Sequence, residues 1–288
     1  MTAFRSRAFH ALAVDFRIES QEAEIGEYVA ELFDAFAPGD DDRAVTYSIV
    51  CRDDDPRRYR VDLDDAGIVS TGSGSELASS VVSTINTAAI GIDYAVMLHA
   101  GAVARDGIVY VFPAHTESGK TTLTAGLVRA GFDYVSDEAV AIGWESGIVE
   151  PYPKPLSIDE GSQHLFAELR PARAPGDDGS TSGQWQVPIA AFGGPARVAP
   201  PARIGVIAFP AYATDASTEL VPMTRADALV ELARNTFQFR DQPRRALTLL
   251  ADVVRAANCF RLPIGDLDAA CALVDGLASA RVAESTRG

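Results

Sequence analysis

Cysteine is scarce in this chain of 288 residues, which contains only Cys51, Cys259 and Cys271. These residues are too few and too widely spaced for a disulfide framework or a structural zinc site. Cysteine at such a low level, with no pairing pattern, is typical of proteins from a reducing compartment. We therefore expect a cytoplasmic protein.

Long apolar segments are also missing. No run in the sequence approaches the ~18 consecutive apolar residues of a transmembrane helix. The N-terminal stretch MTAFRSRAFHALAV has two arginines and no long apolar core, so it lacks the pattern of a signal peptide. The sequence therefore predicts no membrane-spanning segment and no membrane partner.

Positive charge is in short supply, because 25 Lys and Arg residues stand against 40 Asp and Glu residues, which gives a net charge of −15. Such an acidic chain binds nucleic acids and anionic membranes poorly, although a local basic patch can still bind phosphate. Apolar residues make up 47% of the chain, which is enough for a sizeable core. We expect a globular protein with no nucleic-acid partner.

Residues 1–92 are predicted to form a small N-terminal α/β unit. Alternating apolar residues indicate strands, and apolar residues at intervals of three and four indicate helices. Ser20 is a candidate N-cap of the first helix. The expected strands are 8–18, 44–51 and 57–63, the expected helices are 20–37 and 75–90, and 67–74 is expected to be a turn region.

Residues 93–288 are predicted to form a second α/β domain, with Thr224 and Asp241 as candidate starts of two helices. Segment 172–201 is rich in Gly, Pro and Ser, and we expect a mobile loop there, inside this domain, because strand-like sequence follows it. The expected strands are 95–112 with a turn at 105–107, 132–135, 203–209 and 259–265, and the expected helices are 121–130, 224–237, 241–257 and 266–277.

The stretch FPAHTESGKTT, residues 112–122, has the pattern of a phosphate-binding loop. It follows the apolar run IVYVF and precedes the helical run TTLTAGLVRA, which is the strand–loop–helix context that such a loop requires. In such loops successive backbone N–H groups and the helix N-terminus face the anion, the lysine reaches the β- and γ-phosphates, and the next hydroxyl binds Mg²⁺. The candidate nucleotide-binding residues are Ala114, His115, Thr116, Glu117, Ser118, Gly119, Lys120, Thr121 and Thr122.

Two residues of this loop depart from the usual pattern. Ala114 stands where a glycine usually opens the loop, and Glu117 replaces a position that is often glycine. If position 117 needs a positive φ, a residue other than glycine costs about 1 kcal/mol there. We expect the Glu117 carboxylate to point to solvent, and contact with the metal is the alternative. The alternative that 112–122 is only a Gly-Lys turn capping a helix leaves the preceding buried strand and the Thr-Thr pair unexplained.

Three further residues near the loop can carry chemistry. Asp137 and Glu138 follow the strand-like run FDYV, where one acid can bind Mg²⁺ and the other can accept a proton from an attacking hydroxyl. His99 lies in the strand before the loop strand, and we expect it to approach Asp137. The plainer alternatives are a solvated strand end for the acids and a core position for the histidine.

Together, His99-Ala-Gly, the loop and GFDYVSDE resemble the HPr kinase/phosphorylase family and its kinase-like relatives. The resemblance implies a P-loop core related to phosphoenolpyruvate carboxykinase, and it implies ATP and Mg²⁺ as cofactors. It also implies that His99 is the active-site histidine, Lys120 the phosphate-binding lysine and Asp137 the base towards the acceptor hydroxyl. Thr121, Asp137 and Glu138 are the implied metal-site residues.

The stretch PYPKPLSID, residues 151–159, stands where HPr-specific enzymes carry a glycine-rich signature loop. In this respect the chain is similar to short relatives found beside natural-product pathways, such as lasso-peptide precursor kinases. The resemblance therefore implies an ATP-dependent kinase of a hydroxyl acceptor other than HPr, with a peptide or protein serine preferred over a small molecule. A non-catalytic nucleotide-binding regulator or scaffold is the alternative from another class. The guanine motif N-K-x-D is absent, which favours ATP over GTP.

An added cation would stabilise charge on a transferring phosphoryl group. The run NTFQFRDQPRR, residues 235–245, combines an amide, two aromatic residues and three arginines, and it is also compatible with a solvated turn between two helices. Because enzymes of the family that act on HPr form hexamers, the resemblance leaves a homo-oligomer open. The candidate cations, which the sequence does not rank, are Lys154, Arg203, Arg240, Arg244 and Arg245.

Overall fold

A computed structural model of the chain shows a mixed α/β protein with several β-sheets and, in its described part, seven α-helices. Its contacts group the chain into two compact units, which we call unit 1 (Met1–Ile92 with Pro153–Phe192) and unit 2 (Asp93–Tyr152 with Gly193–Gly288). Residues 153–192 thus group with residues 1–92, whereas the sequence predicts a single boundary after residue 92. The structure describes residues 2–52, 55–63, 66–70, 72–91, 93, 95–115, 118–177, 183–193 and 197–285.

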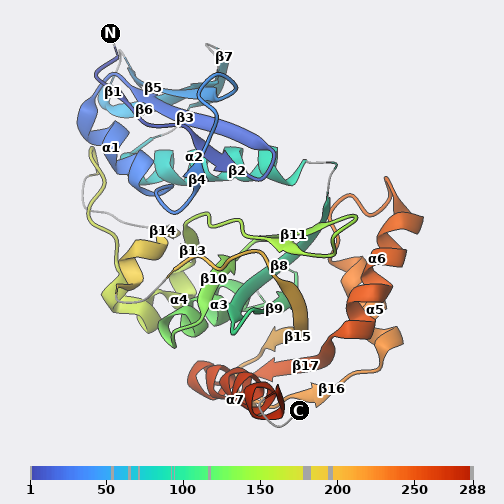
Figure 1. Cartoon of the computed structure of the whole chain (residues 1–288). Coiled ribbons are helices and arrows are strands. Elements are labelled where there is room, and N and C mark those ends of the chain that lie inside the picture. The colour runs from blue at the N-terminus through green and yellow to red at the C-terminus, as the bar shows by residue number, and fades with distance from the viewer. Residues whose placement is uncertain are drawn as a thin grey trace. The chain divides into compact units, whose positions relative to one another are not determined.

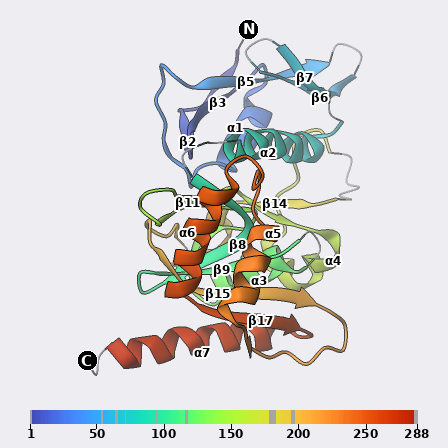
Figure 2. The same ribbon diagram turned by 90° about the vertical axis from the view of Figure 1, so that its right-hand side faces the viewer.

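Unit 1 is built on a seven-stranded sheet in the order β4-β2-β3-β5-β6-β7, with β1 paired to β3. Helices α1 (Ala23–Glu31) and α2 (Gly74–Ile90) lie on one face of this sheet (Figures 1 and 2). Both helices bury residues at helical spacing, such as Ile25 and Val29 in α1 and Leu77 and Val81 in α2. The strands are β1 (Phe4–Arg5), β2 (Phe9–Ala11), β3 (Val14–Ser20), β4 (Ala37–Pro38), β5 (Val45–Arg52), β6 (Asp55–Leu63) and β7 (Ala66–Ser70).

Three local predictions for residues 1–92 were wrong. The strand expected at 8–18 is a hairpin, because Leu12 with a φ of 59° turns the chain between β2 and β3. The helix expected at 20–37 is confined to α1, and Ser20 ends β3 while Glu22 is the N-cap. The turn region expected at 67–74 contributes β7, since an antiparallel ladder with β6 overrides its turn-rich composition.

The remainder of unit 1 comes from residues 153–192. Here β13 (Leu156–Ile158) and β14 (Trp185–Val187) form a two-stranded antiparallel sheet. Three short helices accompany it, α4 (Glu160–Gln163), the 3₁₀ helix η1 (His164–Leu169) and the 3₁₀ helix η2 (Ile189–Phe192). Residues 178–182 and 194–196 of the loop predicted at 172–201 lie outside the described residues, so its predicted mobility stays a prediction.

Unit 2 is built on an eight-stranded mixed sheet in the order β12-β11-β8-β9-β15-β17-β16, with β10 paired to β8. The central strands β9, β15 and β17 are parallel, so their carboxyl ends meet at one edge of the sheet. The strands are β8 (Ala95–Arg105), β9 (Ile108–Pro113), β10 (Asp133–Ser136), β11 (Ala139–Gly143), β12 (Val149–Glu150), β15 (Arg203–Tyr212), β16 (Val221–Pro222) and β17 (Asn258–Ile264).

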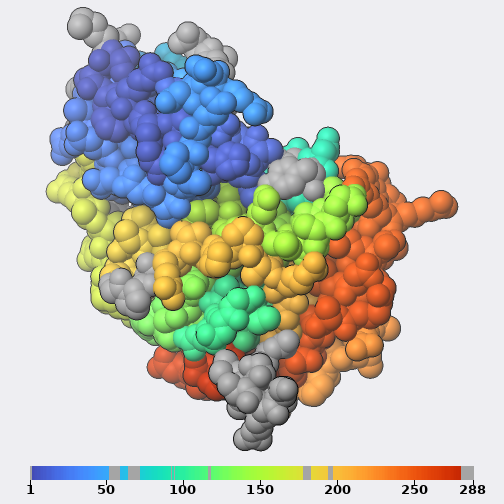
Figure 3. Space-filling view, viewed as in Figure 1, coloured from blue at the N-terminus to red at the C-terminus, as the bar shows by residue number. Residues whose placement is uncertain are grey.

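Helices cover both faces of this sheet. Helix α3 (Lys120–Arg129) lies on one face with α7 (Leu267–Ser285) packed against it, and α5 (Arg225–Arg234) and α6 (Pro243–Ala256) lie on the other (Figures 1 and 2). Residues of α5 and α6 form a continuous part of the surface of unit 2 (Figure 3). Within the described ranges, none of the helices combines the length and the apolar character that crossing a bilayer requires.

Local sequence explains how several of these elements begin. The N-cap expected at Thr224 is confirmed, because its hydroxyl accepts the backbone N–H of Asp227 at 3.2 Å. Helix α6 begins two residues after the expected start at Asp241, since Gln242 is its N-cap and Pro243 its first residue. The apolar run of β9 is buried on both faces, as expected for a central strand with helical layers on either side.

Gly101 on β8 lets helix α3 approach the sheet closely. A Cβ atom added to Gly101 would lie 2.3 Å from the hydroxyl of Thr124 and 3.3 Å from the carbonyl oxygen of Lys120. Thr124 is fully buried and Lys120 O belongs to the backbone of α3, so a side chain at this position would crowd the helix. The position of α3 therefore depends on the absence of a side chain at residue 101.

Gly101→Ala should consequently lower the free energy of unfolding by about 1–3 kcal/mol through overpacking. The matched control is Gly276→Ala in α7, where an added Cβ meets nothing within 4 Å and should stabilise the helix by roughly 0.4–1 kcal/mol. Urea unfolding of both variants measures the difference. Equal stability of the two variants would show that α3 does not rest against β8 at Gly101.

Candidate functional site

The candidate phosphate loop connects β9 to α3 at the carboxyl edge of the parallel strands. Its last residue, Gly119, is the N-cap of α3 and has a φ of 85°, a left-handed conformation that favours glycine. The Gly119 carbonyl accepts the N–H of Leu123 at 2.9 Å, so the helix and its positive N-terminal end begin directly at the loop. Thr116 and Glu117 lie outside the described residues, and the predicted strain at Glu117 therefore stays a prediction.

The side chain of Lys120 is directed into the loop. It is 6% exposed, and its Nζ donates a hydrogen bond to the carbonyl oxygen of His115 at 3.1 Å. The hydroxyl of Ser118 donates to the same carbonyl at 2.8 Å. An ammonium and a hydroxyl thus converge on one carbonyl oxygen of the loop, and both are groups that can donate to phosphate oxygens.

His99 is tied to this loop through the backbone. The N–H of Ala114, the first loop residue, donates to the carbonyl oxygen of His99 at 3.3 Å. On its other side β8 pairs with β11, where His99 lies opposite Ala139 and the N–H of Ala100 donates to the carbonyl of Glu138 at 3.1 Å. The sheet therefore places the histidine, the acidic pair and the start of the loop next to one another.

The acid that meets His99 is Glu138. Its Oε1 lies 3.3 Å from His99 Nε2, and the two side chains are 33% and 18% exposed. The sequence predicts an approach of His99 to Asp137 instead, which the structure does not show. Asp137 is instead buried and accepts a hydrogen bond from Tyr134.

Asp137 lies inside the protein, with 0% of its surface exposed. Its Oδ1 accepts a hydrogen bond from the Tyr134 hydroxyl at 3.0 Å. The neighbouring turn is stabilised by Ser136, whose Oγ accepts the N–H groups of Glu138 and Ala139 at 3.3 and 3.2 Å. Burial, followed by the negative charge of Asp137 and their hydrogen bond, raises the pKa of Tyr134 well above its ordinary value of 10.0.

Tyr134→Phe should lower the free energy of unfolding at pH 7 by about 1–2 kcal/mol, because Asp137 loses a buried hydrogen bond. The pKa of Tyr134 is raised in the folded state, so its contribution to stability is complete below the unfolded pKa and declines as pH rises above ~10. The difference between wild type and Tyr134→Phe should therefore narrow at alkaline pH. Urea unfolding at pH 7 and at a pH above ~10 measures this difference in stability. The control is Tyr212→Phe, at a tyrosine that is 58% exposed. Equal stability of wild type and Tyr134→Phe at pH 7 would contradict a stabilising hydrogen bond between Tyr134 and Asp137.

The segment between α5 and α6 approaches His99 from another side. The N–H of His99 donates to the carbonyl of Asn235 at 2.7 Å, and the N–H of Phe237 donates to the carbonyl of Met97 at 2.8 Å. The Phe237 ring lies 5.3 Å from the His99 ring, measured between centroids. The sequence marks 235–245 only as a source of candidate arginines, and the contact of Phe237 with His99 was not predicted.

The candidate cations occupy different surroundings. Arg245 lies over the Trp144 ring at 4.5 Å and forms an ion pair with Glu145 at 2.7 Å, which holds it on the surface of unit 2. Lys154 belongs to unit 1, is 3% exposed, and donates to Pro155 O at 3.0 Å and Ser157 Oγ at 3.1 Å. Arg203, Arg240 and Arg244 are exposed, and their predicted role in phosphoryl transfer stays a prediction.

Tyr212 is a site neighbour that sequence reasoning missed. It ends β15, the parallel neighbour of β9, and is 58% exposed. Its Cβ lies 3.5 Å from the place where a Cβ on Gly119 would be. The only signal for this position is the parallel pairing of β15 with β9, because ligands of open α/β sheets bind beyond the carboxyl ends of the strands.

Binding of a nucleoside triphosphate with magnesium at this loop stays a prediction. No group of three His, Cys, Asp or Glu side chains in the described part of the chain could hold a metal ion by itself. Magnesium in phosphotransferases needs no such group, since one or two carboxylates, a hydroxyl and the phosphates of the substrate supply its ligands. The predicted ligands of the magnesium ion remain Thr121, in the first turn of α3, Asp137 and Glu138. Comparison with known proteins finds no matching family and no matching curated sequence.

Proposed function

We propose that this protein is an ATP-dependent phosphotransferase that moves the γ-phosphoryl group of MgATP to a hydroxyl acceptor, with a peptide or protein serine as the preferred class. The observation that carries the proposal is the backbone link between the loop and the acid–histidine pair. Ala114 N–H bonds to His99 O, and His99 Nε2 lies 3.3 Å from Glu138 Oε1. A phosphate-binding loop beside a group that can accept a proton is the minimum that transfer to a hydroxyl requires.

In this proposal MgATP, when bound, supplies the phosphoryl group and the charge of the metal ion. Lys120 neutralises the phosphates, and its present partner, the carbonyl of His115, marks the place of its ammonium group inside the loop. The N-terminus of α3 adds further positive potential at Gly119. Thr121 supplies a hydroxyl ligand for the metal.

We assign the role of proton acceptor to Glu138. A general base must come within hydrogen-bond reach of the acceptor hydroxyl, and Glu138 is one-third exposed whereas Asp137 is fully buried. His99 orients the Glu138 carboxylate and can share its proton. Asp137, which the resemblance to HPr kinase/phosphorylase makes the base, keeps a role at the metal or in holding the turn through Tyr134.

Transfer of ³²P from γ-labelled MgATP to defined acceptor pools tests the proposal. One pool contains serine peptides, the second contains small metabolites with hydroxyl groups, and the control protein carries Lys120→Met. Label in the peptide pool that the control does not produce is the expected result, and label in the metabolite pool would move the acceptor to a small molecule. Binding of MgATP without transfer to either pool and without ADP formation would contradict the proposal and favour a nucleotide-binding regulator or scaffold.

A further inference from the structure

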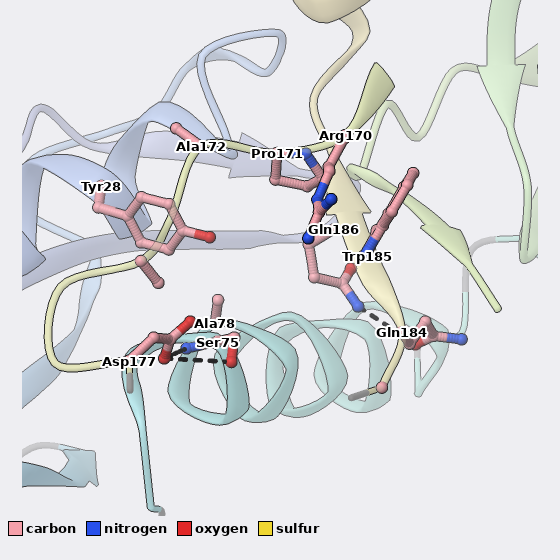
Figure 4. A pocket seen from close by; sticks show the side chains of 12 residues that line it. Tyr28, Ser75, Ala78, Arg170, Pro171, Ala172, Asp177, Gln184, Trp185 and Gln186 are labelled. Carbon is pink, nitrogen blue, oxygen red and sulfur yellow. Dashed lines mark hydrogen bonds between the residues drawn. The ribbon is translucent and has the colours of Figure 1, made fainter. Parts of the chain in front are cut away.

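Unit 1 contains a small pocket that has no part in the proposed phosphotransfer chemistry. Its cavity volume is about 40 Å³. Its walls come from α1, from α2 and from the segments 170–177 and 183–186 (Figure 4). The residues that matter for its chemistry are Tyr28 of α1, Ser75 and Ala78 of α2, and Asp177, Trp185 and Gln186.

The carboxylate of Asp177 is half satisfied. Its Oδ1 accepts hydrogen bonds from the backbone N–H and the hydroxyl of Ser75, at 3.2 and 3.3 Å, which ties it to the first turn of α2 (Figure 4). Its Oδ2 is buried and, within the described residues, has no hydrogen-bond partner, while the residue as a whole is 9% exposed. The hydrogen bonds to the start of α2 account for the burial of Oδ1. Buried charged atoms are normally paired, so the unpaired Oδ2 needs another explanation.

The charge of Asp177 acts on two nearby tyrosines. Burial and then the charge of Asp177 raise the pKa of Tyr28, so its phenol stays protonated. The pKa of Tyr59 is raised to about 12, first by burial and then by the charges of Glu22 and other acids that include Asp177. Two arginines lie nearby, but Arg173 donates to the backbone carbonyl of Asp177, and Arg170 lies at the opposite end of the pocket from the carboxylate (Figure 4).

We propose that this pocket binds a primary alkylammonium group. The ammonium donates to Asp177 Oδ2, and the alkyl stem packs against the rings of Tyr28 and Trp185, whose faces also attract a cation. The small volume favours an ammonium over the larger, planar guanidinium. A free amine and a lysine side chain present the same chemistry, and the proposal does not depend on phosphotransfer.

Fluorescence of Trp185 provides the test. The chain has two tryptophans, so Trp144→Phe leaves Trp185 as the sole reporter in the full-length protein. The probes are n-butylammonium, N-acetyl-lysine amide and, as a neutral control, 1-butanol. The variants are Asp177→Asn, which keeps an oxygen for Ser75 but removes the charge, and Asp34→Asn, which removes the same charge at an exposed position of unit 1 outside the pocket.

We expect a saturable fluorescence change with both amines and none with 1-butanol. Asp177→Asn should raise the half-saturation concentration at least about tenfold, and Asp34→Asn should leave it within about twofold. Should Asp177→Asn fail to fold, Ala172→Leu at the exposed mouth of the pocket should block both amines without touching the carboxylate. Tighter binding of the lysine derivative identifies a peptide side chain as the source, and tighter binding of butylammonium identifies a free amine. Absence of saturable binding, or equal binding of 1-butanol, or equal binding by Asp177→Asn, overturns the proposal.

Discussion

Lys120→Met should weaken the binding of MgATP roughly 30- to 150-fold, which corresponds to about 2–3 kcal/mol. Lys120 is 6% exposed, and its ammonium group donates to the carbonyl oxygen of His115 within the loop. In the proposed function Lys120 is the one ammonium among the described loop residues that neutralises the phosphates, and the substitution removes it. The methionine side chain keeps most of the apolar stem, so packing beside the loop should change little.

Isothermal titration calorimetry with MgATP and MgGTP measures this effect. The matched control is Arg129→Ala, which removes a positive charge from the other end of the same helix, where Arg129 faces Asp268 at 3.5 Å. Arg129→Ala should bind MgATP within about twofold of the wild type, because exposed ion pairs contribute little. MgATP binding by Lys120→Met at the wild-type level would show that the loop does not hold the phosphates.

Glu138→Gln should reduce the rate of phosphoryl transfer by roughly 10²- to 10⁴-fold while MgATP binding stays within about threefold. The substitution keeps the size of the side chain and removes its ability to take a proton. Glu138 is the acid that meets His99, and it is exposed enough to reach an acceptor. Its removal should therefore act on the transfer step and not on the binding of the nucleotide.

Asp137→Asn is the comparison that separates the two acids. The asparagine oxygen can still accept the Tyr134 hydroxyl, so we expect the turn to be preserved and the transfer rate to fall less than in Glu138→Gln. The rates are measured as label transferred to the acceptor and as ADP formed. If Asp137→Asn is inactive and Glu138→Gln transfers label near the wild-type rate, the base is Asp137, as the resemblance implies, and not Glu138.

The parts of the site that are local in sequence were predictable. The buried run of β9, the glycine before Lys120 and the helix after it follow one another along the chain, and the structure has a strand, a loop and a helix at these places. Such patterns depend on near neighbours only, so one sequence is enough to read them.

The parts that depend on pairing between distant segments were not predictable. The contact of His99 with Glu138 depends on the pairing of β8 with β11, in which His99 lies opposite Ala139. The position of Tyr212 beside the loop depends on the parallel pairing of β15 with β9. Asp177 lies in a Gly- and Pro-rich segment that reads as a loop, and its burial arises from contact with the start of α2, 102 residues away along the chain.

Chemical labelling of the two lysines tests the central claim, that the loop binds nucleotide phosphates, most directly. Lys120 and Lys154 are the only lysines in the sequence, so an acyl-phosphate derivative of ATP, which acylates an amine close to the phosphates, can mark only two side chains. Mass spectrometry of the digested protein then reads each lysine separately. Acylation of Lys120 that excess MgATP suppresses is the predicted result. Absence of a label at Lys120, or a label that MgATP does not suppress, would contradict nucleotide binding at this loop.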